Sequence, residues 1–464
     1  MSTAETAQTE KLQQQDNLVV HPWEDFNEIG NQTRTIIEGS DGIYVMDSDG
    51  NRLIDGPAGM WCVNIGHGRR EMADCIAEQA MQLPYFSPWS IATAPAAVLA
   101  EKIASLAPGD LKRVFFATGG SSAVDSALRF VMFYNNRKGR PEKKQIISRQ
   151  EAYHGSTYLA AACSGKQADK KDMDFADELV HLIPSPNPYK RPAGMSLEDF
   201  RAAKLADLEN KILEVGPDKV AAFIAEPILA SGGVIVPPPG YHKGCLEICR
   251  KYDVLYISDE VVTGFGRLGH FFASEAVFDI LPDIITTAKG LTSGYVPMGA
   301  VLISERLVQE LGDSGDDAAI FSNGFTYSGH PVAAAAALKN IEIMEREDLM
   351  AHVREVGPYF QERMQSLRQS PIVGDVRGMG LMACVECDIV KDGKTDEKLS
   401  ANAGSRIDKH CQELGLIVRP IGSRCVMSPP LIITKAQIDE LVGILQEGIR
   451  RTEADLQAEG LIEA

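Results

Sequence analysis

Two oppositely charged residues each follow an apolar run of the chain. Asp259 comes after residues 254–257, and Lys289 comes after residues 284–288. If both runs are strands of one parallel sheet, their carboxyl ends share an edge and the two side chains can point into one crevice. A buried lysine is costly unless it is paired or used covalently. The pair therefore indicates either a buried salt bridge or a Schiff-base lysine, with an aspartate that holds a pyridinium N–H.

Two further segments could complete such a site. Residues 119–122 (GGSS) lie between an expected strand and an expected helix, where free N–H groups and the hydroxyls of Ser121 and Ser122 can bind an anion. Taken alone, this segment would be read as a turn with a serine cap. Residues 153–155 (YHG) offer an aromatic plane, although His154 alone would be read as a structural histidine. Together the four parts favour pyridoxal 5'-phosphate as the ligand.

Two other motifs are judged to be structural. Residues 264–269 match GxGxxG, but Asp259 and Glu260 precede the first glycine, their charge would oppose a pyrophosphate, and no helical pattern follows. Cys384 and Cys387 form a single CxxC inside an apolar run, without a second ligand pair. We therefore predict neither a dinucleotide site nor a metal site.

The pattern of apolar residues predicts the elements that position these groups. Nearly continuous apolar runs alternate with helical stretches in the middle of the chain, at residues 114–117, 220–225, 254–257, 284–288 and 299–304. This alternation is typical of an α/β fold with a mainly parallel sheet covered on both faces. Residues 43–55 predict a hairpin around an Asp-Gly turn, and residues 434–456 predict a final helix with a capping box. The part beyond residue 331 indicates a second, smaller α+β layer.

The sequence resembles the class III pyridoxal-phosphate aminotransferases, and among them the amine:pyruvate type, the ω-transaminases. The resemblance covers about residues 20–450. Asp259 and Lys289 stand thirty residues apart, as that family places them. The motifs that carry the resemblance are 58–67 (AGMWCVNIGH), 153–155 (YHG), 226–228 (EPI), 258–267 (SDEVVTGFGR), 288–290 (AKG) and 325–331 (FTYSGHP).

The resemblance implies a fold-type-I PLP-dependent transferase. In that fold a large domain has a mainly parallel sheet between helices, and a smaller α+β domain is built from both termini. The expected division is 1–20 as a flexible N-terminal arm, 21–75 as the N-terminal part of the small domain, 76–330 as the large PLP-binding domain and 331–464 as the C-terminal part of the small domain.

The resemblance also assigns roles around the cofactor ring. Lys289 carries pyridoxal 5'-phosphate as a Schiff base and moves the proton, and Asp259 pairs with the pyridine nitrogen. Val261 packs on one face of the ring and Tyr153 on the other. The remaining residues of this predicted cofactor site are His154 and Glu226.

The phosphate group is expected to be shared between subunits. By the family pattern, Gly120 and Ser121 bind it from one subunit and Thr326 binds it from the other. This implies a homodimer with shared active sites, and whether dimers pair into tetramers is left open. The chain departs from the family at Ser122, where Glu is usual, which removes a charge beside the phosphate loop.

The substrate residues implied are Trp61, Trp89, Tyr153, Ser231 and Arg419. Relatives that act on ornithine or γ-aminobutyrate carry Glu at the position of Ser231, so its absence points to the amine:pyruvate type. Arg419 is expected to clamp the carboxylate of a keto acid and to swing toward solvent for an apolar amine. The expected reaction is a ping-pong transfer of an amino group from an ω-amino acid, an aliphatic amine or an aromatic amine to an α-keto acid, with pyruvate as the expected acceptor.

Composition bounds the partners and the compartment. The chain has 464 residues and a formal net charge of −18, so an anionic nucleic acid or membrane surface is a poor partner. Nine scattered cysteines predict reduced thiols and a cytoplasmic protein. There is no run of about 18 apolar residues that could span a membrane.

Three alternatives remain open at this point. The first is an aminomutase or decarboxylase of the same fold, and the second is a transaminase specific for another pair of ω-amino acid and keto acid. The third is a binding protein that kept the fold without activity. The presence of Lys289, Asp259, Tyr153 and Thr326 together argues against the third.

Overall fold

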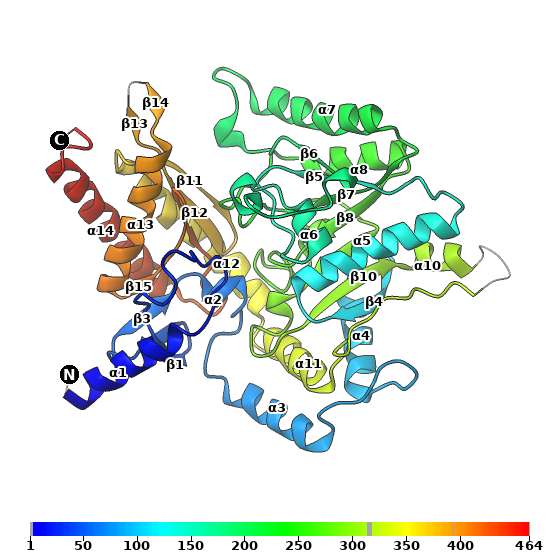
Figure 1. Ribbon diagram of the computed structural model, residues 1–464, viewed down its shortest axis with the longest axis horizontal. Helices are drawn as coiled ribbons and strands as arrows, with labels where there is room; N and C mark the ends of the chain where they lie inside the picture. The colour runs from blue at the N-terminus through cyan, green and yellow to red at the C-terminus, as the bar shows by residue number, and fades with distance from the viewer. Residues whose placement is uncertain (1–2, 313–317, 392, 464) are drawn as a thin grey trace.

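The computed structural model describes residues 3–312, 318–391 and 393–463, and two units lie side by side in it (Figure 1). The middle of the chain, from cyan to light green, forms the larger unit. The two ends of the chain, blue and orange to red, come together in the smaller one. This arrangement confirms the expected α/β fold with a second unit built from both termini.

A seven-stranded sheet forms the centre of the larger unit, with the strand order β4-β10-β9-β8-β7-β5-β6. Its strands are β4 (Leu111–Ala117), β5 (Gln145–Arg149), β6 (Val180–Ile183), β7 (Val220–Ala225), β8 (Leu255–Asp259), β9 (Ile284–Thr287) and β10 (Gly299–Ser304). β10 pairs antiparallel with β4 and β9, whereas β5 to β9 pair in parallel. The prediction of a mainly parallel sheet is confirmed.

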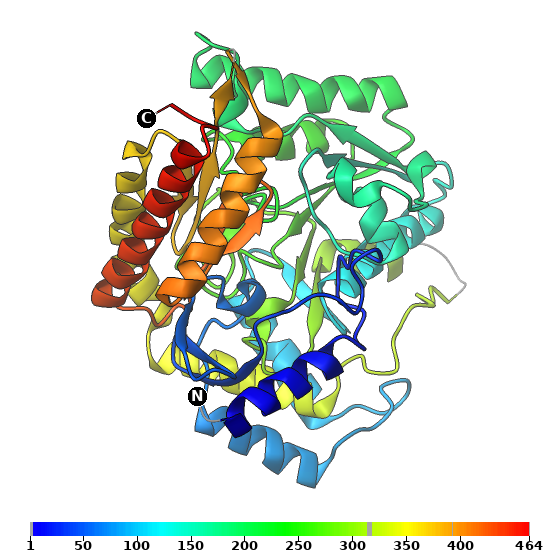
Figure 2. The same ribbon diagram turned by 60° about the vertical axis from the view of Figure 1, so that its left-hand side comes forward.

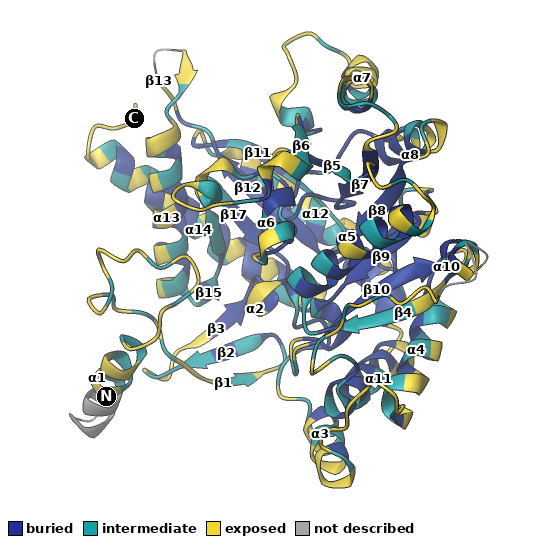
Figure 3. Ribbon diagram, turned by 45° about the vertical axis from the view of Figure 1, so that its right-hand side comes forward, coloured by how far each residue is buried: buried dark blue, intermediate teal, exposed yellow. Residues whose placement is uncertain are grey.

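Helices cover both faces of this sheet, which explains why its strands are apolar throughout. Ile224 and Ile257 pack on the side of α5, and their neighbours Phe223 and Tyr256 pack on the side of α7 and α8. Successive side chains of a strand point to opposite faces, so both faces need apolar residues. Figure 3 shows the buried strands between partly exposed helices. The covering helices are α5 (Gly120–Arg137), α6 (Tyr158–Cys163), α7 (Leu197–Val215), α8 (Tyr241–Lys251) and α10 (Glu305–Gly312).

Helix α11 (Pro331–Arg346) packs against two helices, α3 (Arg70–Gln82) and α4 (Ala94–Leu106). Their buried side chains join a core that extends into the smaller unit. The predicted division at residues 75/76 falls inside α3, and the division at 330/331 falls at the first residue of α11. The proposed domain limits therefore cut through one packed group of helices.

The smaller unit contains two four-stranded sheets. The first has the order β1-β2-β3-β15, in which β15 from the C-terminal part pairs in parallel with β3 from the N-terminal part. The second has the order β11-β12-β17-β16. The strands are β1 (Ile37–Asp41), β2 (Tyr44–Asp47), β3 (Arg52–Asp55), β11 (Val373–Met379), β12 (Met382–Cys387), β15 (Leu416–Ile417), β16 (Arg419–Ile421) and β17 (Arg424–Met427); β13 (Val390–Lys391) and β14 (Lys394–Thr395) form a separate small hairpin.

Three helices cover this unit: α12 (Leu349–Gln365), α13 (Glu397–Leu414) and α14 (Lys435–Ala458). Figure 2 shows α13 and α14 side by side. The predicted final helix is confirmed, including the capping box between Thr434 and Gln437. The predicted hairpin is confirmed as the antiparallel pair β2 and β3.

The N-terminal segment has more structure than the sequence suggests. Residues expected to form a flexible arm contain the helix α1 (Thr3–Asp16). After it, the Arg34 guanidinium contacts the carboxylates of Asp16 and Glu24, at 3.5 and 2.8 Å. This contact folds the loop back and brings Trp23 toward the larger unit. No helix in the described part of the chain is long and apolar enough to cross a membrane.

Candidate active site

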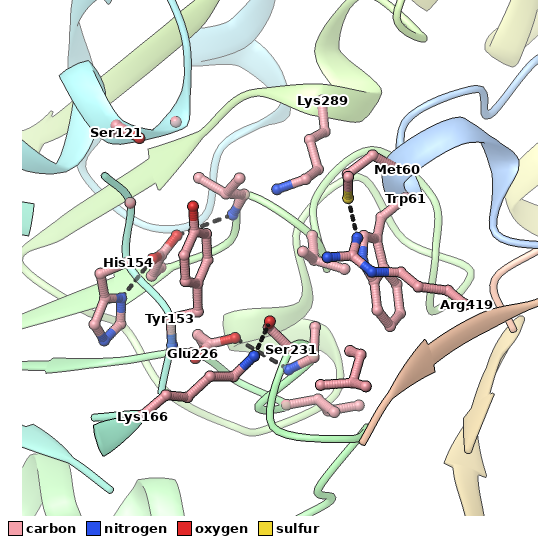
Figure 4. A pocket seen from close by; sticks show the side chains of 18 of the residues that line it. Met60, Trp61, Ser121, Tyr153, His154, Lys166, Glu226, Ser231, Lys289 and Arg419 are labelled. Carbon is pink, nitrogen blue, oxygen red and sulfur yellow. Dashed lines mark hydrogen bonds and ion pairs between the residues drawn. The ribbon is translucent and has the colours of Figure 1, made fainter. Parts of the chain in front are cut away.

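A cavity of about 360 Å³ lies at the carboxyl ends of β7, β8 and β9, where the two units meet (Figure 4). Among the predicted site residues, eleven line it: Trp61, Gly120, Ser121, Tyr153, His154, Glu226, Ser231, Asp259, Val261, Lys289 and Arg419. The edge of a parallel sheet at its carboxyl ends is where ligands bind in such folds. The topology therefore gathers into one place residues as far apart in the sequence as Trp61 and Arg419.

Lys289 stands in a strained turn directly after β9. Its φ of 41° lies in the left-handed region, which is unfavourable for a residue with a Cβ and is found at functional sites. Asn340 of α11 holds this turn by donating from Nδ2 to the carbonyls of Gly290 and Leu291. Burial lowers the pKa of Lys289, and Asp259 opposes part of this shift. In the described part of the chain its Nζ has no hydrogen-bond or ion-pair partner.

Asp259 is fixed from three sides. Its Oδ2 lies 2.6 Å from His154 Nδ1, and its Oδ1 accepts from the hydroxyl of Thr286 at 3.0 Å and from the backbone N–H of Val261 at 3.2 Å. Both Asp259 and His154 are buried. Three hydrogen-bond donors or ring nitrogens around one buried carboxylate fix its orientation. The site therefore holds an oriented carboxylate beside the unpaired amine of Lys289.

Glu226 follows β7 and holds the loop that carries Tyr153. Its Oε1 accepts from the backbone N–H of Tyr153 and its Oε2 from that of Ala230, each at 3.0 Å. Burial raises the pKa of Glu226, while His154 opposes the shift. A buried carboxylate with two backbone donors fixes the backbone positions of both neighbours, so Glu226 positions the Tyr153 ring over the cavity.

The first turn of α5 supplies an anion site. The residue before the helix is Gly119, so no side chain at this position occupies the free N–H groups of the first turn. The positive end of the 18-residue helix and these N–H groups therefore face the cavity. Ser121 Oγ accepts from the backbone N–H of Ser156 at 3.1 Å, which joins the turn to the Tyr153 loop. Ser122 donates to the carbonyl of Gly119 and accepts from the N–H of Thr118. Ser122 therefore holds the backbone of Thr118 and Gly119 just before the helix.

Cationic side chains line the opposite side of the cavity. Arg419, the first residue of β16, points inward and its Nη1 contacts the Met60 sulfur (Figure 4). Burial lowers the pKa of Arg419. Lys166 donates from Nζ to Ser231 Oγ at 2.5 Å. A thioether is a weak acceptor that cannot satisfy a guanidinium, so Arg419 is available to an anionic ligand.

Two predicted residues lie outside this cavity. Thr326 is exposed, and its carbonyl accepts from the Tyr85 hydroxyl at 2.9 Å. Trp89 is 72% exposed in the loop between α3 and α4. Neither is part of the cavity within one chain, so their roles as phosphate and substrate contacts stay predictions that require a second subunit.

Trp23, Lys166 and Asp169 line the cavity and are among the residues that sequence reasoning missed. Trp23 lies 6.0 Å from the Tyr153 ring, centroid to centroid, and donates from Nε1 to Asp169 Oδ1 at 3.1 Å. Lys166 and Asp169 belong to a polar stretch that reads as a surface loop. No local pattern distinguishes them from solvated charges, because only the fold of the N-terminal segment brings Trp23 here.

The two motifs judged structural lie in packed parts of the fold. Cys384 and Cys387 are buried in β12 as free thiols. Residues 264–269 form turns, followed only by the short helix α9 (Ala273–Ala276). Within them Arg267 is fully buried, and its guanidinium donates to Asn64 Oδ1 and to the carbonyl of Leu381. Burial lowers the pKa of Arg267 to about 9. The described residues contain no cluster of metal ligands.

Comparison with known proteins agrees with this geometry. The family described as aminotransferase class III matches residues 27–449. The putrescine–pyruvate aminotransferase of Pseudomonas aeruginosa is 41% identical over 99% of both chains. The (S)-enantioselective ω-transaminase of Thermomicrobium roseum has a TM-score of 0.90 and 36% identity over 96% of this chain and 98% of that one. The ω-transaminase of Pseudomonas jessenii, in complex with PMP, has a TM-score of 0.92 and 35% identity over the same shares.

Proposed function

The chain belongs to the class III aminotransferase family, and from that membership we propose which residues do its chemistry and which substrates it takes. It is an enzyme that transfers an amino group from an amine to a keto acid. The observation that carries the assignment of residues is the unpaired amine of Lys289 beside the oriented carboxylate of Asp259, in a cavity that also holds an unpaired guanidinium.

Class III aminotransferases depend on pyridoxal 5'-phosphate, and the residues of this cavity fit that group. A Cβ at Gly120 would lie 3.0 Å from Val261 Cγ1, so glycine leaves the N-terminus of α5 accessible to a phosphate. Asp259 offers a carboxylate to a protonated ring nitrogen, and Lys289 offers a free amine to the carbonyl carbon. Tyr153 and Val261 line the space between these groups.

We assign the following roles to the chain's own residues. When bound, pyridoxal phosphate supplies an electron sink for the charge left after an α-proton is removed. Lys289 moves that proton, and its lowered pKa favours the neutral amine that a base requires. Asp259, held by His154, keeps a positive charge favourable at the ring nitrogen. Glu226 keeps Tyr153 in place over the cavity.

The proposed donor is an ω-amino acid or an aliphatic or aromatic amine, and the proposed acceptor is pyruvate, in a ping-pong cycle. Ser231 supports this choice, since it leaves Arg419 without an internal carboxylate partner and free to bind the acceptor. A panel of amines with pyruvate, scored by alanine formed, tests the proposal. A same-fold aminomutase or decarboxylase would convert the amine without forming alanine.

Two further parts of the proposal concern the assembly and the compartment. Apolar side chains are exposed beside Thr326, among them Tyr327 at 59% and Trp89 at 72%. An exposed apolar patch marks an interaction surface, so we propose a homodimer that meets here.

The nine cysteines are free thiols, which supports a reducing compartment, the cytoplasm.

The first prediction concerns Arg419. Arg419→Ala should raise the KM for pyruvate and for alanine about tenfold or more, because a charge-assisted bond to a carboxylate contributes roughly 1.5–3 kcal/mol. The KM for an apolar amine should change less than about threefold, because that substrate has no carboxylate. Half-reaction kinetics measured separately with each substrate provide the comparison. Arg419→Lys should keep part of the preference, and equal losses toward both partners would leave Arg419 a structural role only.

A further inference from the structure

Met60 presents a thioether sulfur to the cavity, directly beside Arg419. It lines the cavity, and its sulfur contacts Nη1 of the Arg419 guanidinium (Figure 4). The Met60 side chain is 49% exposed, and in the described part of the chain only two methionines, Met81 and Met173, are more exposed. An exposed thioether is open to oxidation to the sulfoxide, which is a common oxidative change of methionine.

The turn that carries Met60 is held in place by Asp55. Ala58 and Trp61, on either side of Met60, have φ angles of 49° and 65°, in the left-handed region. Such a strained backbone persists only where its surroundings hold it. Both carboxylate oxygens of Asp55 accept from the backbone N–H of Gly59, each at 2.8 Å. The Met60 side chain therefore extends from a fixed backbone and not from a loose loop.

The segment that carries Arg419 is joined to this turn. Asp55, the last residue of β3, pairs in parallel with Ile417, two residues before Arg419. A Cβ at Gly56 would lie 2.4 Å from the carbonyl oxygen of Ile417, so the two backbones are in close contact. Met60 and Arg419 therefore both belong to the smaller unit, and backbone pairing keeps them adjacent.

Oxidation changes what the sulfur of Met60 can offer to the guanidinium. A thioether is a weak acceptor, whereas a sulfoxide is polar and its oxygen can accept from N–H groups. With hydrogen peroxide, the sulfur attacks one peroxide oxygen, and the S–O bond forms as the O–O bond breaks. The sulfur is oxidised by two electrons, and the peroxide is reduced to water, which keeps both protons. The cavity of about 360 Å³ is large enough to admit this oxidant.

We propose that Met60 is a modification site, at which oxidation to the sulfoxide gives Arg419 an internal hydrogen-bond acceptor and weakens the binding of the keto acid. The inference rests on the proposed function, because it takes Arg419 as the group that binds the carboxylate of the acceptor. An apolar amine has no carboxylate and makes no use of the guanidinium, so its binding is unaffected. Oxidation thus acts on the acceptor half of the cycle.

Peptide mapping and carboxylate binding test the site without catalysis. After limited treatment of the holoenzyme with hydrogen peroxide, mass spectrometry should find one added oxygen on Met60, as on Met81 and Met173. Calorimetry with propanoate, an unreactive acid as long as pyruvate, should show about fivefold weaker binding, because the acid now competes with a charge-assisted bond. Methionine sulfoxide reductases for both epimers should restore the binding. Dithiothreitol alone, which reverses mild oxidation of the partly exposed Cys62, should not.

Variants assign the effect to one sulfur. Each variant is compared with its own untreated form, and Met60→Leu should abolish the response of propanoate binding to peroxide. Met81→Leu and Met173→Leu are the matched controls, since neither residue lines the cavity, and both should respond as the wild type does. Met60→Gln places an amide oxygen near Arg419 and should weaken propanoate binding without any peroxide.

A kinetic comparison separates this inference from the proposed function. Oxidation of the wild type should raise the KM for pyruvate about fivefold and change the KM for an apolar amine less than about twofold. If no amine reacts with pyruvate but propanoate binding still responds to oxidation through Met60, the modification site is supported and the proposed function fails. The inference is overturned if Met60 stays unmodified while Met81 and Met173 are oxidised. It is equally overturned if oxidised Met60 leaves propanoate binding unchanged, or if Met60→Leu still loses binding after peroxide.

Discussion

Lys289→Ala is expected to lower turnover by at least about 10³-fold, because the change removes both the covalent attachment point and the base that moves the α-proton. The variant should still bind pyridoxal phosphate, since the N-terminus of α5, Ser121 and Asp259 remain. Its fold should be intact, because the Lys289 side chain has no hydrogen-bond or ion-pair partner among the described residues. The loss should therefore appear in kcat at unchanged solubility and melting temperature.

The covalent link gives this variant a readout besides activity. Borohydride reduction followed by mass spectrometry should fix the cofactor to the wild-type chain and leave the Lys289→Ala chain unmodified. Lys243→Ala, which removes an exposed lysine paired with Asp279, serves as the control and should behave as the wild type. Sustained multiple turnovers of amine transfer by Lys289→Ala would be incompatible with the role of this residue.

The central pair could be predicted because its signal is local. Asp259 and Lys289 each end an apolar run, and the rule that such runs become parallel strands places both at one edge of the sheet. The structure has Asp259 at the last position of β8 and Lys289 two residues after β9. The final helix was predictable for the same reason, since its capping box and apolar stripe are properties of neighbouring residues.

The residues that could not be predicted depend on tertiary contacts. Trp23 reaches the cavity through contacts distant in the sequence, because its indole donates to Asp169 and its ring lies beside that of Tyr153. In the sequence Lys166 is typical of a solvated surface charge. In the structure the turn at Gly165 packs against strand β5 and directs Lys166 into the cavity. The charge and polarity of neighbouring residues do not show which loop turns toward the cavity. The residues that loops contribute to the site can therefore be identified only from the three-dimensional structure.

The direction of strand β10 relative to its neighbours could not be predicted from its own residues. β10 is apolar on both faces, like its parallel neighbours, yet it pairs antiparallel with β4 and β9. Burial on both faces sets the composition of a strand but not its direction. The direction follows from the connection between β9 and β10, which is a short turn-rich segment without a long crossover helix.

The second large effect is expected from mixing two inactive chains. Thr326 is exposed and outside the cavity of its own chain, although the family pattern makes it a phosphate contact, so it should act in the site of a second subunit. Thr326→Asp should inactivate the enzyme, because a carboxylate there would repel the phosphate. In a heterodimer of Lys289→Ala and Thr326→Asp chains, one site combines an intact Lys289 with an intact Thr326. That site should recover about half of the wild-type activity per dimer.

The arrangement of the two changes decides the outcome. If Thr326 instead served the site of its own chain, every site in the mixed dimer would carry one defect, and activity would stay absent. Heterodimers isolated with two affinity tags exclude signal from contaminating parent dimers, and each parent homodimer gives the baseline. A dimer that carries both changes in the same chain, paired with a wild-type chain, is the matched control. Its two sites receive Lys289→Ala from one chain and Thr326→Asp across the interface, so sharing predicts that this dimer is inactive, whereas unshared sites would leave it half active.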